Sequence, residues 1–286
     1  MNKYDIVSTL KLVKDYFNFS DEKLASELSI SRTTLNNWLN DKKEISDNNL
    51  DNLYDYVFDK GMMINEISSY MYIEECNTKT TKALFHGSKQ GIIGEISYSK
   101  AKDFNDFGKG FYCGENYNQA ATFIAPYDKS SVYTIYFDSN KLQSIELDVD
   151  QEWMLAIAYY RGTLDKYKSN KYIQKIINRI DKADYIIAPI ADNKMFNIID
   201  TFINGEITDE QCKHCLAATD LGKQYVFKTQ KCLNNLKLLN RMYICSNERK
   251  SLLLEKNKQQ LLGQEKVKTA RIKYRGKGKY IDEILL

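Results

Sequence analysis

The chain has 286 residues, of which 43% are hydrophobic and 28% are charged. This is the composition of a globular protein with one good core and room for a small second domain. No apolar segment approaches the roughly 20 residues that a membrane-spanning helix needs, so we expect no such helix. The net charge of +3 is too small to indicate a partner. Residues 1–5 lack the apolar core of a signal peptide, so we expect a cytoplasmic protein whose six cysteines are reduced.

Residues 1–75 are expected to form an all-helical domain. The segment 21–28 carries apolar residues at helical spacing, a short turn follows at Ser29, and Ser31 is a good N-cap for a second helix over residues 32–39. Small and apolar residues at the crossing point are what two helices joined by a short turn require. The pattern therefore predicts two helices that cross at a tight turn.

This pair of helices resembles the helix-turn-helix of phage-repressor-type regulators, in which the second helix enters the major groove of DNA. The resemblance places Arg32, Thr33, Asn36 and Asn37 opposite the bases, and Ser29 stands where that family usually has a glycine. Six acidic residues follow between positions 41 and 59, and they oppose phosphate binding. A helical module for protein interaction or dimerisation therefore stays open as the alternative.

From residue 80 to residue 245, short strands and helices follow one another in an irregular order. This order favours an α+β fold over a parallel βαβ sheet. The expected strands cover residues 83–86, 110–113, 132–137, 185–189 and 224–228. The expected helices cover residues 118–125, 152–160, 172–180, 196–204 and 230–239, and another helix opens at Thr208. Asp184 and Asp192 are interpreted as turn and capping residues.

Two segments of this region carry the most specific signal. Residues 84–88 (LFHGS) end the first expected strand, and residues 106–112 (DFGKGFY) lead into the second. In this order they resemble the nicotinamide-binding core of ADP-ribosyltransferases of the diphtheria-toxin and poly(ADP-ribose) polymerase type, and in particular a group of uncharacterised bacterial and phage domains. The resemblance spans residues 84–239. It implies the split β-sheet core of an ADP-ribosyltransferase, with NAD as co-substrate and no metal.

The resemblance also implies a role for each motif residue. His86 is expected to donate a hydrogen bond to a ribose hydroxyl, while Gly87 and Ser88 contact the carboxamide of nicotinamide. Tyr112 is expected to stack on the nicotinamide ring, and Phe123 or a nearby aromatic residue to supply the opposite wall. Because the leaving group of NAD is already cationic, orientation of the ribose and stabilisation of an oxocarbenium-like centre are the main requirements.

Three further positions complete the predicted site. Lys109 and Gly110 are expected beside the phosphates of NAD, although a lysine between two glycines can also simply face solvent. The third catalytic position, usually a glutamate that opens a late strand, is Gln224 in this chain. A neutral amide can hydrogen-bond to the ribose but cannot act as a base, so we expect single transfer and no chain elongation. A surface role on an edge strand is the alternative for Gln224.

Taken together, the motifs predict an NAD-dependent mono-ADP-ribosyltransferase, of the toxin or defence type, that modifies a macromolecule. The alternative is a regulatory protein that binds NAD or ADP-ribose through a degenerate, non-catalytic domain and binds DNA through the helix-turn-helix. Transfer to an RNA 2'-phosphate usually needs additional His and Arg residues that are absent from these motifs. A protein acceptor or an antitoxin is a further expected partner.

The last segment, residues 246–286, is expected to be a basic helix followed by a basic tail. Basic residues interleaved with Tyr274 and Tyr280 are typical of an arm that contacts nucleic acid, and a solvated, partly disordered tail is the alternative. Cys212, His214 and Cys215 resemble half of a zinc site, but no second pair of ligands has suitable spacing. No metal is therefore expected there.

Overall fold

The computed structural model describes residues 4–99, 101–218 and 221–285. Residues 1–3, on which part of the signal-peptide argument depends, lie outside the described residues. The fold is α+β, as the sequence predicts. Among the described residues, no helix has both the length and the apolar character needed to cross a bilayer.

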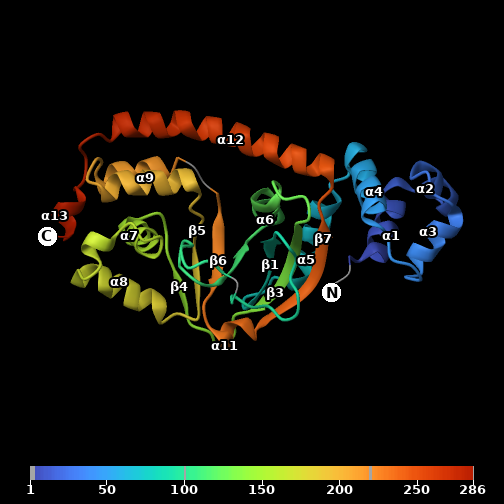
Figure 1. Ribbon diagram of the computed structural model, residues 1–286, viewed down its shortest axis with the longest axis horizontal. Coiled ribbons are helices and arrows are strands. Elements are labelled where there is room, and N and C mark those ends of the chain that lie inside the picture. Colours follow the sequence, from blue (N-terminus) through green and yellow to red (C-terminus); the bar gives the residue numbers. More distant parts are fainter. Residues whose placement is uncertain (1–3, 100, 219–220, 286) are drawn as a thin grey trace. The chain divides into compact units, whose positions relative to one another are not determined.

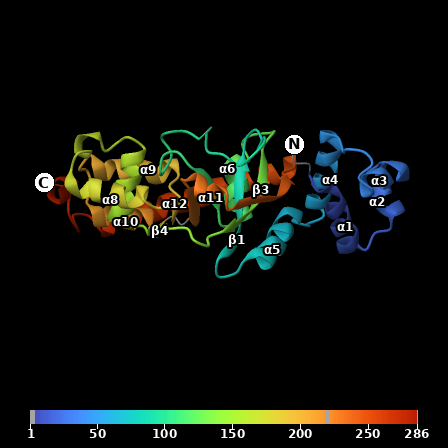
Figure 2. The ribbon, with the colours of Figure 1, turned by 90° about the horizontal axis from the view of Figure 1, so that it is seen from below.

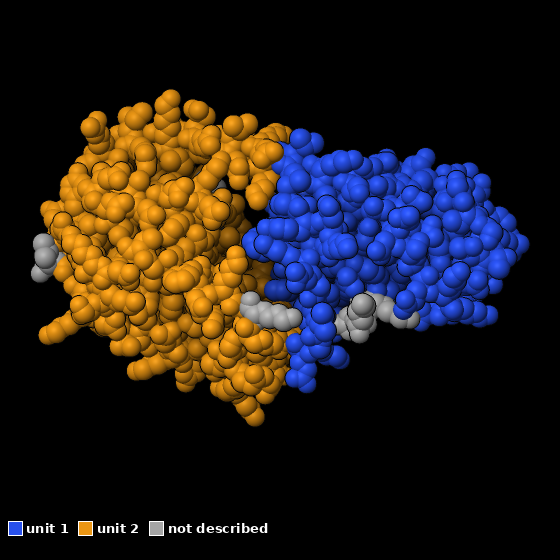
Figure 3. Space-filling view, viewed as in Figure 1, with its two compact units in different colours: residues 1–95, 116–137, 237–255 blue, residues 96–115, 138–236, 256–286 orange. Residues whose placement is uncertain are grey.

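The chain divides into two compact units, which Figure 3 distinguishes by colour. Unit 1 contains residues 1–95, 116–137 and 237–255, and unit 2 contains residues 96–115, 138–236 and 256–286. Each unit is therefore assembled from three separated stretches of sequence. The boundary expected between residues 75 and 80 falls inside unit 1.

Five helices open unit 1, and side-chain caps define where most of them begin. They are α1 (Ile6–Phe17), α2 (Asp21–Glu27), α3 (Arg32–Leu39), α4 (Asp47–Asp59) and α5 (Ile64–Cys76). The hydroxyls of Ser20, Ser31 and Ser46 accept hydrogen bonds from backbone N–H groups in the first turns of α2, α3 and α4. Ser29 has a φ of +53°, the left-handed conformation that a glycine adopts most easily. The two helices predicted around this turn are thus confirmed.

The remainder of unit 1 packs strands against α5 and α6. The strands β1 (Thr81–Ser88), β3 (Ser131–Asp138) and β7 (Leu236–Tyr243) are neighbours in that order. The helix α6 (Tyr117–Ile124) begins with a reciprocal pair of hydrogen bonds between Asn116 and Gln119. Phe85, Ile124 and Met242 are among the residues of the shared apolar core.

One expected helix is wrong. The helix predicted over residues 230–239 ends after α11 (Gln230–Leu233), and the chain continues as β7. The backbone of Asn235 bonds to that of Asp138 (N···O 3.2 Å), and its side chain donates to the Asp138 carbonyl (2.9 Å). These contacts bring the chain to the end of β3, where strand pairing overrides the helical preference of the leucines that follow.

Unit 2 places a mixed sheet against a layer of helices (Figures 1 and 2). Its strands follow the order β4 (Ser144–Glu146), β5 (Tyr185–Pro189), β6 (Lys223–Phe227) and β2 (Phe111–Gly114). The β4–β5 pair is parallel, while β5–β6 and β6–β2 are antiparallel. The helices are α7 (Gln151–Tyr160), α8 (Lys171–Asp181), α9 (Asn193–Ile203) and α10 (Asp209–Leu216), with a short 3₁₀ turn over Asp165–Tyr167. Ile186, Ala188 and Val226 face this helical layer in one core.

The predicted caps of unit 2 are confirmed. Thr208 caps α10, and Asp192 caps α9 by accepting a hydrogen bond from the Met195 N–H (2.8 Å). Asp184 accepts a hydrogen bond from the backbone N–H of Gln143 (3.0 Å) and pairs with Lys231 (2.8 Å). The hydrogen bond from the Gln143 backbone is the main cause of a lowered pKa at the Asp184 carboxyl, and the Lys231 ammonium lowers this pKa further. Both aspartates are therefore structural.

The end of the chain forms two helices and packs in unit 2, while most of its basic side chains stay exposed to solvent. The helix α12 (Ser246–Lys273) is followed by a turn and by α13 (Ile281–Leu285). Ile281 and Leu285 are buried in the core of unit 2. Tyr274 stacks on His214 with ring centroids 3.5 Å apart, and the Lys279 N–H donates to Asp209 (2.7 Å). Aromatic stacking and two buried aliphatic side chains hold this segment in place.

Candidate functional site

The first motif segment lies in unit 1, at the end of β1. His86, Gly87 and Ser88 are half-buried. A Cβ atom on Gly87 would lie 2.7 Å from the carbonyl oxygen of Ala120 and 2.8 Å from Cγ2 of Ile124. Both distances are too short for a side chain, so the packing of α6 on β1 requires a glycine whether or not a ligand binds. From the sequence alone, the only reason for this glycine was its expected contact with the carboxamide of nicotinamide.

Phe123, the expected aromatic wall, belongs to the same helix. Ala120 and Ile124 of α6 face β1, whereas Phe123 is 64% exposed. Its ring is thus available on the surface of unit 1, and a role in holding nicotinamide stays a prediction.

The second motif segment lies in unit 2, where the hydroxyl of Tyr112 closes a short loop. This hydroxyl donates a hydrogen bond to the Gly108 carbonyl (2.7 Å) and accepts one from the Phe107 N–H (3.1 Å). Gly108 has a φ of +70°, which lets the chain turn back toward the ring. Burial raises the pKa of Tyr112, so its hydroxyl stays protonated and can donate. The polar end of the ring is therefore fixed at two points.

The strand register places Tyr112 and Gln224 on the same face of the sheet. Tyr112 pairs with Val226, and Gly114 pairs with Gln224, across the antiparallel strands β2 and β6. Residues 224 and 226 point to the same side because side chains alternate along a strand. Diagonal neighbours of this kind lie about 7–8 Å apart. Two of the three predicted catalytic residues are thus brought together within one unit.

A buried carboxylate, Asp106, lies beside Gln224. Asp106 is only 6% exposed. Its Oδ1 accepts from the Arg161 guanidinium, with Nε at 2.9 Å, and its Oδ2 accepts from the Ala191 N–H (3.1 Å) and from Nε2 of Gln224 (2.8 Å). Arg161 also donates to the Ala191 carbonyl (2.7 Å). A guanidinium, a backbone amide and a side-chain amide therefore converge on one carboxylate.

All of these partners of Asp106 are donors, so the site requires a side chain that accepts at both of its oxygen atoms. Arg161 stands at the C-terminal end of α7, with its guanidinium 4.5 Å above the ring of Phe196. No sequence motif indicates a role for Asp106 or Arg161. They are 55 positions apart, and Asp106 and Gln224 are 118 positions apart, so no local spacing could have indicated the network.

Lys109 and Gly110 lie in the same loop. The Lys109 ammonium pairs with Asp103 at 3.0 Å, and both side chains are more than half exposed. A Cβ atom on Gly110 would lie 2.7 Å from Cγ1 of Val226, so the approach of β6 requires this glycine. Contact of either residue with the phosphates of NAD stays a prediction.

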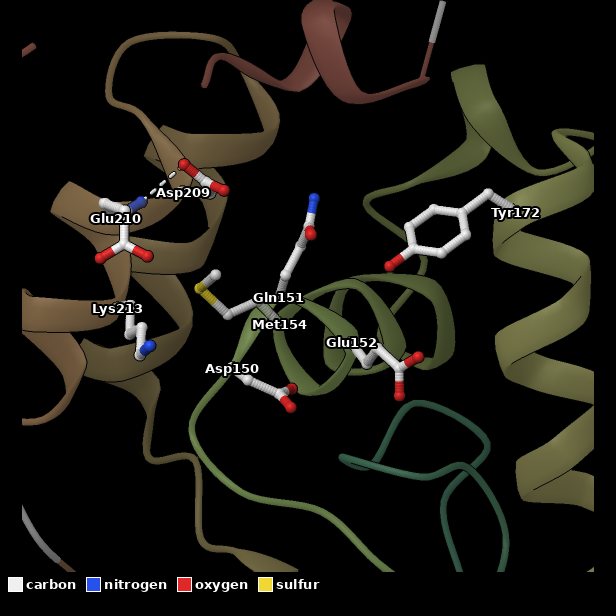
Figure 4. Close-up of a pocket in the computed structure, with 8 residues that line it drawn as sticks. All are labelled: Asp150, Gln151, Glu152, Met154, Tyr172, Asp209, Glu210 and Lys213. Carbon is white, nitrogen blue, oxygen red and sulfur yellow. Dashed lines mark hydrogen bonds between the residues drawn. The ribbon is translucent and has the colours of Figure 1, made fainter. Parts of the chain in front are cut away.

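One hollow in unit 2 has a different character from a dinucleotide site. It measures about 290 Å³ and is lined by Asp150, Gln151, Glu152, Met154, Tyr172, Asp209, Glu210 and Lys213 (Figure 4). Four carboxylates and one ammonium line it, and these carboxylates would repel the pyrophosphate of NAD. It also contains none of the predicted motif residues.

The residues expected to contact DNA lie on α3. Arg32, Thr33 and Asn36 are exposed and Asn37 is half-buried. Arg32 pairs with Glu22 (2.7 Å), and the Asn36 side chain accepts a hydrogen bond from Asn40 (2.9 Å). These exposed side chains form a polar surface on α3.

The acidic residues of α4 have internal partners. Asp51 accepts a hydrogen bond from the Tyr243 hydroxyl (2.9 Å), and Asp55 accepts one from the Asn247 N–H (2.9 Å). Asp59 accepts from the side chain of Asn247 (3.1 Å). Carboxylates at the start of α12 also suit the positive end of that helix. Three of the six acidic residues that oppose phosphate binding in the sequence thus form hydrogen bonds that stabilise unit 1.

The cysteine-rich segment of α10 is structural. Cys212 and Cys215 are buried, and their thiols lie 3.7 Å and 3.8 Å from the carbonyl oxygens of Ile198 and Val267. Burial raises the pKa of the Cys212 thiol well above its usual value. Within residues 4–99, 101–218 and 221–285, no group of three or more His, Cys, Asp and Glu side chains could hold a metal ion.

A comparison with families of known sequence gives one informative finding. A family model described as "Protein of unknown function (DUF3990)" matches residues 82–238. The matched region is more than half of the chain and contains His86, Tyr112 and Gln224, while α1–α5, α12 and α13 lie outside it. No curated protein and no solved structure matches the chain.

Proposed function

We propose that this chain, which belongs to the family of unknown function DUF3990, is an NAD-dependent mono-ADP-ribosyltransferase that modifies a macromolecule. The observation that carries the proposal is the fixed ring of Tyr112. Its hydroxyl is bound at two points to the backbone of residues 107 and 108, and Gln224 lies diagonally across the sheet on the same face. A preorganised aromatic ring is what stacking on nicotinamide requires.

In this proposal, Tyr112 stacks on the nicotinamide ring of NAD. Gly87 and Ser88 hold the carboxamide, and His86 donates a hydrogen bond to a ribose hydroxyl. The bond between ribose and nicotinamide then breaks, and the cationic leaving group takes the bonding electrons and departs as neutral nicotinamide. The acceptor attacks the oxocarbenium-like ribose and loses its proton to water. Orientation of the ribose in this way lowers the barrier without a strong general acid.

The neutral side chain at position 224 supports single transfer. A glutamate there could accept a proton from an attacking ribose hydroxyl, whereas the amide of Gln224 cannot. The same observation favours a second candidate, a protein that binds NAD without turnover. Binding measured by calorimetry, together with the absence of released nicotinamide, would select this second function.

The polar surface of α3 supports a role in recruiting a nucleic acid. Arg32, Thr33 and Asn36 are exposed, and the carboxylates of Asp51 and Asp55 on α4 are occupied by partners within unit 1. We propose that α2 and α3 bring a nucleic-acid acceptor to the transferase, with a protein acceptor or an antitoxin as the alternative partner of this surface.

Mass spectrometry of the protein and nucleic-acid fractions after expression identifies the acceptor. We expect a fraction to gain the mass of one ADP-ribose unit in cells that express the wild type, and to lose it with His86→Ala. The matched control is His214→Ala, which removes the chain's other histidine and leaves the motif intact. Equal modification by the wild type and His86→Ala, or none by the wild type, would argue against the transferase.

A further inference from the structure

We propose that Gln224 is a positioning residue: its amide nitrogen holds Asp106 and, through Asp106, fixes the ring of Tyr112. This inference rests on the proposed function, because it divides the roles within the NAD site. It gives position 224 a role that the resemblance does not imply, beside the contact with ribose that it does imply.

Both donor hydrogens of Gln224 are already used within unit 2. A primary amide has two N–H hydrogens. Nε2 of Gln224 donates to Oδ2 of Asp106 (2.8 Å) and to the carbonyl oxygen of Pro189 (3.1 Å). The residue is only 6% exposed. Contact of this nitrogen with a ribose hydroxyl would break one of these two buried hydrogen bonds.

The two partners also explain why position 224 is not a glutamate. Both the Asp106 carboxylate and the Pro189 carbonyl are acceptors, so the side chain between them must donate. An ionised glutamate would place a second carboxylate against that of Asp106, and only its protonated form could restore one hydrogen bond. A glutamine stands at position 224 instead of the usual glutamate because Asp106 beside it needs a hydrogen-bond donor.

Asp106 is linked to the ring of Tyr112 by the next two residues of the backbone. Phe107 donates its N–H to the Tyr112 hydroxyl, and Gly108 accepts from that hydroxyl. Arg161 and the Ala191 N–H hold the carboxylate from the other side. A displacement of the Asp106 side chain is therefore passed to the two backbone groups that orient the ring.

The pH dependence of NAD binding by Gln224→Glu separates positioning from direct contact. Asp106 and Arg161 are the charged groups that bond to this cluster within the described residues. We expect Gln224→Glu to bind NAD at least tenfold more weakly than the wild type at pH 8, where the new carboxyl is ionised. Affinity should recover toward the wild-type value at pH 5, as protonation restores a donor. If position 224 acted only through contact with the ribose, Gln224→Glu would bind NAD as tightly as the wild type, or more tightly, at pH 8.

The matched control is Gln211→Glu, which alters another buried glutamine outside the motifs. Gln211 is 7% exposed and donates to the carbonyl of Arg271 (2.6 Å). The Gln211→Glu variant should bind NAD with the affinity of the wild type at pH 5 and at pH 8. A pH-dependent loss of the same size in this control would attribute the effect to general destabilisation and overturn the inference.

A second measurement needs no NAD and covers the case in which Gln224→Glu does not fold. The protein is labelled with 3-fluorotyrosine, and the fluorine resonance of Tyr112 is assigned by its loss in Tyr112→Phe. In Gln224→Met, which keeps the volume but has no donor, we expect this resonance to shift or broaden. An unchanged Tyr112 resonance would overturn the inference. Failure of the wild type to bind NAD would instead reject the proposed function, so the two failures are distinguishable.

Discussion

The two motif segments are held in place by different interactions. At the end of β1 in unit 1, Gly87 is fixed by apolar and backbone packing against α6, with no room for a Cβ atom. In unit 2, the segment that begins at Asp106 is fixed by buried hydrogen bonds to Arg161, Ala191 and Gln224. The first segment is therefore sensitive to volume, and the second is sensitive to charge and to the direction of hydrogen bonds.

The largest effect is expected for Asp106→Asn. The new amide presents a donor to partners that are all donors, and it leaves the guanidinium of Arg161 without its carboxylate. Breaking a buried ion pair in this way destabilises a protein by about 3–5 kcal/mol. Urea unfolding would measure the change. Asp103→Asn is the control, because Asp103 is exposed and pairs only across the surface with Lys109, and its free energy of unfolding should change by less than about 1 kcal/mol. Equal stability of the two variants would contradict the buried network.

Unit 1 also contains a buried polar cluster, but outside the motif, and it should make unfolding pH-dependent. Burial of the Glu248 carboxyl raises its pKa from 4.5 to about 7, despite hydrogen bonds from Tyr117 and Asn65 that favour the ionised form. The folded state therefore binds a proton more tightly than the unfolded state. Stability should fall as the pH rises from about 4.5 to about 7, by on the order of 3 kcal/mol, and stay level above that range.

Thermal unfolding of the wild type and of Glu248→Gln between pH 4.5 and pH 8 checks this. The variant should lack the component of the pH dependence that lies below pH 7. Parallel curves for the two proteins would mean that Glu248 is not the responsible group.

A smaller loss is expected for Gly87→Ala. The added Cβ would lie 2.7 Å from the Ala120 carbonyl oxygen and 2.8 Å from Ile124, so α6 must shift. Overpacking of this kind destabilises by about 1–3 kcal/mol. Chemical denaturation, with Ser88→Ala as the control on the same strand, would measure it. If Gly87→Ala were as stable as the control, the glycine would be required only by a ligand.

The smallest effect on stability is expected for Tyr112→Phe. Loss of the hydroxyl removes its hydrogen bonds with Phe107 and Gly108 but keeps the aromatic ring, so stability should fall by about 1 kcal/mol. NAD affinity should fall at least tenfold, because the ring loses both contacts that orient it, and Tyr112→Ala should bind more weakly still, since it also loses stacking worth about 1–3 kcal/mol. Calorimetric titration with NAD compares the two variants. Equal affinities in both would remove the ring from the site.

Much of the fold could be predicted because its signals are local. The Ser31 and Thr208 caps and the β-branched strand over residues 132–137 depend on neighbouring residues alone. The strand β7 was missed because its pairing with β3 is decided by a contact almost a hundred positions away, between Asn235 and Asp138. The docking of Ile281 and Leu285 likewise depends on a core that the tail's basic composition does not indicate.

The candidate site was predictable to a similar extent. Tyr112 and Gln224 were identified by motif, and the β2–β6 register places them on one face. The partners of Gln224 could not be predicted, because Asp106, Pro189 and Arg161 meet only after four separate elements have packed. The steric requirement for Gly87 could not be predicted either, because the sequence does not show that the helix carrying Ala120 packs against β1.

Release of nicotinamide from NAD tests the central claim most directly. With NAD labelled in the nicotinamide ring, the purified protein should release label, and His86→Ala and Tyr112→Ala should each reduce the rate at least tenfold. Two controls should keep the wild-type rate: His214→Ala, and Tyr70→Ala, which removes a tyrosine that is 65% exposed on α5. No release by the wild type in the presence of cell extract as a source of acceptor, or an unchanged rate in folded His86→Ala and Tyr112→Ala, would contradict the proposed transferase.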